Sequence, residues 1–332
     1  MTSIEQQPII STHNLNKSFD GNLAVEDLSL SIPEGIIFGF IGPSGCGKTT
    51  SVRLLLGIYE PDSGEVEVFN RTPRHFRRSE QEQIGYMPQL FVLYPELSTW
   101  ENLNFAASIY GQPVQRKEHL MDLLELVKLE GETGKKVRNL SGGMQRRLSL
   151  AAALVHDPRL IFLDEPTSGI DPVLRRKFWD YFRVLRDEGR TLFVTTQYVG
   201  EAAYCDLVGV MADGRLVVVD TPEGLRRQAL GGELIHLHTS IYMNDTQLEK
   251  LSEQEFVIAP EIRHLDNRGI EIVIDQANIA IPQLLAWCEE ERIVVDSATE
   301  YIPLFDDVFV QLMEQNSAQD ANEALFEEAT GD

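Results

Sequence analysis

The sequence predicts an α/β fold divided into two units, and three observations support this prediction. A glycine-rich loop at residues 42–50 joins an apolar, strand-like run to a helix-like segment. From about residue 9 to residue 227, short apolar strands alternate with helical segments, as in a mostly parallel sheet covered by helices. After the glycine pair at 231–232 a different order of elements begins, and 332 residues are enough for two domains.

Composition limits the class of protein. The chain is 43% hydrophobic and 24% charged, which is ordinary for a globular protein. No apolar run reaches the roughly 18 to 20 residues that span a bilayer, and the first residues lack the pattern of a signal peptide. Cys46, Cys205 and Cys288 are odd in number and lack metal-ligand spacing, which fits a reducing compartment. We therefore expect a cytoplasmic protein without its own membrane span.

The net charge of −23 is unevenly distributed along the chain. Residues 232–332 hold 22 Asp and Glu against 4 Lys and Arg, whereas residues 1–231 hold 30 against 25. An acidic surface repels phosphate backbones, so we expect no nucleic-acid partner. A solubilising surface is the simplest interpretation of this charge, and a specific cationic partner is the alternative.

The first unit, residues 1–231, contains one interruption of its strand pattern. An apolar strand at 35–41 enters the glycine-rich loop, and a helix follows at 48–56. Between about residues 99 and 155 helical spacing replaces strand signals, which predicts a helical subdomain inserted into the sheet domain. Strands resume at 160–163, 191–195, 207–211 and 215–219.

The glycine-rich loop fits the pattern G-x-x-x-x-G-K-[ST] of a P-loop NTPase, which predicts nucleotide binding. We expect backbone N–H groups to line the phosphates, Lys48 to bridge the β- and γ-phosphates, and Thr49 to hold Mg²⁺. Cys46 occupies a variable position, either as an oxidation-sensitive switch or as a space-filling residue. The predicted binding residues of the loop are Gly42, Ser44, Gly45, Cys46, Gly47, Lys48, Thr49 and Thr50.

Two further segments carry candidate chemistry. The strand at 160–163 ends in Asp164 and Glu165, where a carboxylate at the sheet edge can hold a water of the Mg²⁺ shell; a solvated turn is the alternative. Residues 140–145, Leu-Ser-Gly-Gly-Met-Gln, predict a helix start with Ser141 as N-cap and exposed amides. An isolated helix cap would look similar.

The second unit, residues 232–315, predicts a small α+β domain. Its elements follow the order βαββαβ of a ferredoxin-like sandwich, with a further amphipathic helix at 304–313. Residues 316–332 are polar and acidic, and we expect a disordered tail. The expected strands are 233–239, 262–265, 270–274 and 292–297, and the expected helices are 245–251 and 279–290.

The order of the glycine-rich loop, residues 140–145 and the strand ending in Asp164-Glu165 resembles the ATP-binding cassette (ABC) ATPases. Gln197, the segment Tyr204-Cys205-Asp206 and residues 303–309 resemble the drug-efflux type of ABC-2 exporter ATPases in particular. The resemblance covers residues 9–230 and extends weakly to residue 313. It implies ATP and Mg²⁺ as ligands, Asp164 at the metal, and Glu165 polarising the attacking water. It also implies that residues 140–145, called here the signature segment, contact the ATP bound to a second copy or a homologous cassette through Ser141, Gly142, Gly143 and Gln145.

The same resemblance assigns three further residues. Phe19 matches the aromatic residue that stacks on adenine, although a core position is the alternative. Gln89, in Tyr86-Met87-Pro88-Gln89, matches the glutamine that touches Mg²⁺ or water and passes the nucleotide state to a membrane subunit through residues 91–103. Asp171, in the segment 166–172, matches a residue at the subunit boundary.

One residue departs from the common family pattern. Most ABC ATPases have a switch histidine where this chain has Gln197, after the strand at 191–195. Glutamine can donate a hydrogen bond to the γ-phosphate but cannot take a proton near neutral pH. The drug-efflux subfamily has the same glutamine, so the resemblance marks Gln197 as a catalytic residue of that subfamily.

The sequence therefore predicts an ATPase subunit that powers export through separate membrane subunits, at the cytoplasmic face of the membrane. A soluble ABC ATPase serving a cytosolic assembly complex and a non-hydrolysing nucleotide-binding module are the alternatives. For the second unit three roles stay open: it could stabilise the dimer, sense a small ligand or restrain hydrolysis.

Overall fold

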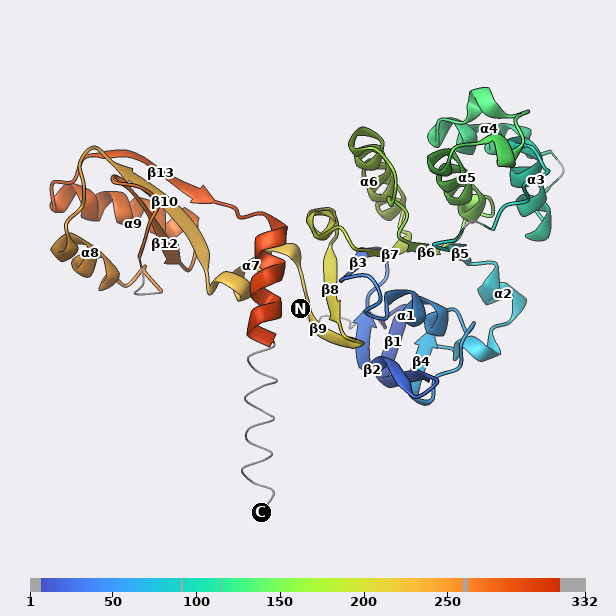
Figure 1. Ribbon diagram of the computed structural model, residues 1–332, viewed down its shortest axis with the longest axis horizontal. Helices are drawn as coiled ribbons and strands as arrows, with labels where there is room; N and C mark the ends of the chain where they lie inside the picture. The colour runs from blue at the N-terminus through green and yellow to red at the C-terminus, as the bar shows by residue number, and fades with distance from the viewer. Residues whose placement is uncertain (1–6, 91, 114, 259–261, 317–332) are drawn as a thin grey trace, which may run out of the picture. The chain divides into compact units, whose positions relative to one another are not determined.

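The computed structural model describes residues 7–90, 92–113, 115–258 and 262–316, which belong to two compact units (Figure 1). The border lies between Val219 and Asp220, earlier than the expected residue 231. Helix α7 (Pro222–Leu230) belongs to the second unit, because Arg226 lies 4.3 Å over the ring of Phe305 and the Gln315 side chain donates to the Ala229 carbonyl at 3.0 Å. The expected acidic tail, apart from residue 316, lies outside the described residues.

The first unit contains a six-stranded sheet in the order β5-β6-β7-β3-β8-β9. From β5 to β8 each neighbouring pair is parallel, which confirms the predicted α/β fold. The carboxyl ends of β3, β6 and β7 therefore meet at one sheet edge. The strands are β3 (Ile37–Ile41), β5 (Ile84–Met87), β6 (Leu160–Asp164), β7 (Thr191–Thr196), β8 (Leu207–Ala212) and β9 (Arg215–Asp220).

A second sheet of the first unit was not expected from the sequence. It is antiparallel, in the order β2-β1-β4, with β1 (Ile10–Phe19), β2 (Asn22–Ile32) and β4 (Ser63–Val68). Asp20 and Gly21 have φ values of 49° and 80° and make the tight turn between β1 and β2. An Asp-Gly pair between two strands is a hairpin signal, and the prediction of a mostly parallel sheet overlooked it.

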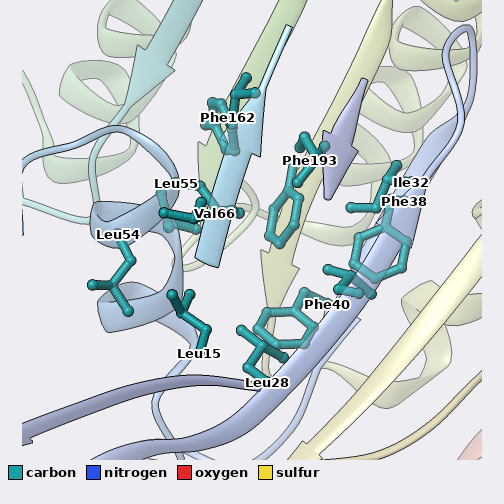
Figure 2. Packing of buried hydrophobic residues seen from close by; sticks show 14 of the residues in the cluster. Leu15, Leu28, Ile32, Phe38, Phe40, Leu54, Leu55, Val66, Phe162 and Phe193 are labelled. Carbon is teal, nitrogen blue, oxygen red and sulfur yellow. The ribbon is translucent and has the colours of Figure 1, made fainter. Parts of the chain in front are cut away.

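The main core of the first unit lies between these two sheets (Figure 2). The ring of Phe193 lies 5.1 Å from that of Phe38 and 5.5 Å from those of Phe40 and Phe162. Helix α1 (Lys48–Leu55) buries its apolar side chains in the same cluster, so the core fixes the helix that follows the glycine-rich loop. Figure 2 also shows Leu15, Leu28, Ile32, Leu54, Leu55 and Val66 in this cluster.

Helices fill the segment where the sequence predicts a helical subdomain. They are α3 (Thr99–Ile109), α4 (Lys117–Leu126) and α5 (Gly142–Leu154), and α5 packs against both of the others (Figure 1). Outside this group, the unit has α1, α2 (Arg78–Gln81) and α6 (Pro172–Asp187). In the part of the chain that is described, no helix has the length and apolar character needed to cross a membrane.

The second unit has the ferredoxin-like order predicted from the sequence. Its antiparallel strands are arranged β11-β12-β10-β13, and α8 and α9 cover one face through a core that includes Ile235, Ile272 and Leu284. Residues 305–316 form a further helix, at the position expected for 304–313. The elements are β10 (Glu233–Thr239), α8 (Asp245–Ser252), β11 (Arg263–His264), β12 (Gly269–Ile274), α9 (Ala277–Glu290) and β13 (Val295–Tyr301).

Candidate functional site

The glycine-rich loop connects the end of β3 to α1 and has no room for side chains at two positions. A Cβ atom at Gly42 would lie 2.1 Å from the Met211 carbonyl oxygen. Gly47 is the N-cap of α1 with φ of 109°, and a Cβ there would lie 2.3 Å from the Ala24 carbonyl oxygen. The tight turn brings backbone N–H groups to the positive end of α1, which suits an anion such as phosphate.

A cavity of about 160 Å³ lies at this loop. The structure brings Gln89 and Glu165, which are far from the loop in sequence, into the same cavity. This volume is below the roughly 300 to 1,000 Å³ of pockets that enclose a drug-sized ligand, so the cavity fits a phosphate chain rather than a whole nucleotide. The other lining residues are Ala24, Ser44, Gly45, Gly47, Lys48, Thr49 and Thr50.

Only one of the two carboxylate oxygens of the buried Asp164 accepts hydrogen bonds from the described residues. Its Oδ1 atom accepts hydrogen bonds from Thr195 Oγ1 at 2.6 Å and Thr49 Oγ1 at 3.2 Å. Its Oδ2 atom is buried and has no partner among the described residues. A buried acceptor without a partner is costly, and a hydrated cation beside Thr49 would satisfy it. Thr49 and Asp164 therefore fit a Mg²⁺ ion at this point, with the Gln89 side chain at the same cavity.

Glu165 lies immediately after β6 in a strained backbone conformation. Its φ of 52° is left-handed, which costs a non-glycine residue about 1 to 3 kcal/mol. Thr195 stabilises this backbone conformation, because the Glu165 N–H donates to Thr195 Oγ1 at 3.0 Å and to the Thr195 carbonyl at 3.1 Å. Asp164 and Glu165 are both buried, so the alternative of a solvated turn does not hold.

Lys48 and Cys46 are both buried in the loop. Lys48 Nζ donates to the carbonyl oxygens of Gly42 at 2.7 Å and Pro43 at 2.8 Å, so its contact with phosphates stays a prediction. Burial raises the pKa of the Cys46 thiol, although the neighbouring Lys48 acts in the opposite direction. A thiol with a raised pKa is a poor oxidation switch, which favours the space-filling role for Cys46.

Gln197 follows β7 and contacts the glycine-rich loop directly. Its Oε1 atom accepts a hydrogen bond from Ser44 Oγ at 2.7 Å, and its side chain is exposed. Because the oxygen of this amide is used by Ser44, the Nε2 group is the part that can donate to a bound phosphate.

Comparison with known proteins shows what this arrangement is similar to. Residues 25–168, which include the loop, the signature segment and both carboxylates, match the family described as ABC transporter. The Nod factor export ATP-binding protein I of Burkholderia orbicola is 37% identical over 231 residues, covering 69% of this chain and 76% of that protein. The chain belongs to the ABC transporter family.

Other relatives of this ABC ATPase agree. A probable multidrug ABC transporter ATP-binding protein of Escherichia coli is 32% identical over 252 residues, covering 76% of this chain and 41% of that protein. A solved ATP-binding subunit of an ABC transporter has a TM-score of 0.61 at 25% identity, covering 66% of this chain and 92% of that one. A dimeric ATP-binding cassette bound to ADP and phosphate has a TM-score of 0.60 at 25% identity, covering 64% and 98%. The chain is thus an ATP-binding subunit of a transporter and hydrolyses ATP.

The signature segment of this ABC ATPase lies outside the cavity that holds Lys48 and Glu165. Ser141 is the N-cap of α5 and accepts from the Met144 N–H at 3.3 Å, as predicted. Ser141 and Gly142 are exposed, so their polar groups are available to a partner. Gln145, in contrast, donates to the carbonyl oxygens of Val137 and Leu140, both at 3.2 Å, and in this structure it holds the loop together. Gly143 is half-buried.

Asp171 and Phe19 also lie outside the cavity lining. The Asp171 carboxylate caps α6, accepting from the N–H groups of Val173 at 3.1 Å and Leu174 at 3.0 Å. Phe19 is 39% exposed and packs edge-on against Tyr59 at 5.2 Å, which excludes the alternative of a core residue. Their roles at the subunit boundary and at adenine stay predictions.

Arg146 is one residue that sequence reasoning missed. It is 5% exposed on α5, and its Nη1 donates to the Gln89 carbonyl at 2.7 Å. Burial lowers the pKa of its guanidinium, while the carboxylates of Glu165 and Asp164 act in the opposite direction. Its position directly after the signature segment, on the buried face of α5, was the available signal.

A second group that the sequence did not single out surrounds Glu201. This side chain is 3% exposed, and its Oε1 accepts from Thr167 Oγ1 at 2.7 Å, with Arg175 Nε at 3.6 Å. Arg175 also lies 4.2 Å over the ring of Tyr198. These contacts join the segment after Glu165 to the segment after Gln197, so Glu201 connects the two loops that carry these residues.

Proposed function

We propose that this ABC ATPase powers an ABC-2 type exporter, with two cassettes closing head to tail on two ATP molecules. The observation that carries this proposal is that Ser141 is exposed and does not line the cavity of Lys48 and Glu165 in its own chain. The exposed start of α5 has free amides and a positive helix end, so a second cassette can present it to the γ-phosphate. Two relatives whose names refer to Nod factor export and to multidrug transport support the assignment to export.

Within each site the residues of this chain divide the work. Lys48 exchanges its carbonyl partners for phosphate oxygens, and the loop amides from Gly45 to Thr50 line the phosphate chain. Thr49, Asp164 and Gln89 would hold the Mg²⁺, which would neutralise charge on the phosphates. Phe19 offers its exposed ring to the adenine base, outside the phosphate cavity.

Glu165 and Gln197 are the residues we assign to the hydrolytic step. Thr195 holds the Glu165 backbone, so the Glu165 carboxylate can orient and polarise the attacking water. Gln197, placed by Ser44, donates to the γ-phosphate and does not exchange protons. Proton transfer in this site therefore depends on Glu165.

Membrane subunits supply the transport path in this proposal, which places the chain at the cytoplasmic face of the membrane. The segment after Gln89 has exposed apolar side chains, with Leu90 78%, Val92 76% and Tyr94 52% exposed. Three exposed apolar side chains within five residues suit a contact with another protein. We assign this segment to the contact with a membrane subunit, next to the Gln89 that lines the phosphate cavity.

The experiment is to measure dimer formation and ATP hydrolysis in Glu165→Gln. Without the catalytic carboxylate, hydrolysis should fall and an ATP-held dimer should accumulate in size-exclusion chromatography with light scattering. Glu118→Gln, an exposed residue of α4, is the matched control and should behave like the wild type. A Glu165→Gln protein that stays monomeric with ATP would remove the shared-site mechanism. Recovery of membrane subunits with the tagged chain tests the transporter assignment separately.

A further inference from the structure

The second unit contains a cavity that the nucleotide chemistry does not use. Its volume is about 470 Å³, within the roughly 300 to 1,000 Å³ of small-molecule pockets. It lies between the helix at 305–316 and the face of the sheet that α8 and α9 leave uncovered. All of its lining residues belong to the second unit, so the cavity is complete within that unit.

The floor of the cavity is an apolar row across three strands. Leu234 of β10 pairs in register with Val273 of β12 and with Tyr301 of β13, and all three line the cavity. The Tyr301 ring is stacked on the ring of His236, with centroids 4.1 Å apart and planes 14° from parallel. This stacking fixes an aromatic face at the cavity.

The opposite wall is one polar face of the last helix. Asp307, Gln311 and Glu314 line the cavity and are spaced four and three residues apart, so they project from the same side of the helix. The other side of the helix buries Phe305 and its apolar neighbours. The Gln315 hydrogen bond to the Ala229 carbonyl anchors this helix to α7, which holds the wall in place.

The wall carries acceptors that the protein leaves unused. Gln311 Oε1 is buried and has no partner among the described residues. Within the same part of the chain, the carboxylates of Asp307 and Glu314 make no ion pair or hydrogen bond. Glu271, which also lines the cavity, differs: its oxygens lie 3.0 Å from His236 Nε2 and 3.9 Å from Arg263 Nη1.

We propose that this cavity binds an organic cation, namely a protonated amine carried on an apolar, ring-containing body. The ammonium N–H groups match the free acceptors of Asp307, Gln311 and Glu314, and the positive charge is attracted by the two carboxylates. The apolar body fits the Leu234–Val273 floor, and Tyr301 adds a cation–π contact. Arg263 also lines the cavity, but the carboxylates of Glu271, Asp307 and Glu314 outnumber this single cation, so binding of an organic anion of the same size is disfavoured. The second unit therefore has a ligand site separate from the ATP site.

The test is a fluorescence titration of the full chain with 9-aminoacridine, which is protonated at neutral pH. We expect saturable one-to-one binding, at least about tenfold tighter than that of the largely neutral acridine. Asp307→Asn combined with Glu314→Gln should weaken dye binding by about tenfold or more. Asp306→Asn, an exposed neighbour on the same helix that does not line the cavity, is the matched control and should leave binding unchanged.

Several results would refute the proposal that this cavity binds an organic cation. They are the absence of saturable binding, equally tight binding of acridine or of an anilinonaphthalene sulfonate, and displacement of the dye by excess ATP. An equal loss in Asp306→Asn would also refute it, because the effect would then come from general surface charge. The comparison of the three dyes uses the wild-type chain, so it decides the question even if the double variant does not fold.

Discussion

Thr195→Val tests the geometry of the proposed catalytic site with little change to the fold. The side chain is buried and nearly isosteric with valine, so the change removes one hydroxyl and little volume. That hydroxyl donates to Asp164 Oδ1 at 2.6 Å and accepts from the Glu165 N–H at 3.0 Å. The second bond has a substitute in the Thr195 carbonyl at 3.1 Å, so the bond to the charged Asp164 dominates the loss.

A hydrogen bond to a charged group contributes about 1.5 to 3 kcal/mol. If this amount is lost in the transition state, kcat falls by about 10- to 150-fold. We expect the affinity for ATP to change by less than about threefold, because the phosphate contacts that we propose for the loop amides and Lys48 do not involve Thr195. Steady-state phosphate release gives kcat, and equilibrium titration with a fluorescent ATP analogue gives affinity.

Thr191→Val is the matched control, at the opposite end of the same strand. Its hydroxyl is also buried and accepts from the Gly35 N–H at 2.9 Å, far from the phosphate cavity. We expect this variant to lose stability but to keep its kcat. A Thr195→Val enzyme with kcat within about threefold of the wild type would refute the role given to this hydroxyl.

Three further predictions follow from the geometry. Gln197→His should keep ATPase activity, because a histidine nitrogen can also donate to the phosphate; a loss greater than about tenfold in kcat would count against a shared role. Thr167→Val and Glu201→Gln should each lower the unfolding free energy by about 1 to 3 kcal/mol. The double variant should lose less than the sum of the two single losses, because the Thr167 hydroxyl donates to the Glu201 carboxylate at 2.7 Å; additive losses in urea melts would contradict this contact. Burial raises the pKa of the Cys288 thiol from 9.0 to about 11, so folding favours the neutral thiol and stability should be lost as pH rises through this range. The loss of unfolding free energy amounts to about 2 to 3 kcal/mol once the pH lies above both pKa values. Urea melts below and above this pH range measure the loss, and Cys288→Ala should remove it.

The local motifs of this chain were predictable because their chemistry depends on neighbours in sequence. The glycine-rich loop, the strand-end carboxylates and the N-cap Ser141 all lie where the sequence places them. The βαββαβ order of the second unit was likewise readable from periodicity.

Contacts between distant segments were not predictable in the same way. The pairing of β1 with β4 depends on a register between Ile10 and Val68 that no local pattern shows. Arg146 and Glu201 act through residues that fold next to them, so neither has a motif of its own. The division of the chain after Val219, rather than near residue 231, depends on contacts of α7 with residues after 300, which no local pattern shows.

The central claim is that each ATP is enclosed by two chains, with Ser141 of one copy completing the site of the other. Disulfide crosslinking between a Ser141→Cys copy and a differently tagged Ser44→Cys copy tests it most directly. Both serines are exposed, whereas the native cysteines are buried and form no competing crosslinks. We predict a crosslink between the two tags that appears with ATP and disappears without it. No crosslink between chains while ATP is being hydrolysed would contradict the claim.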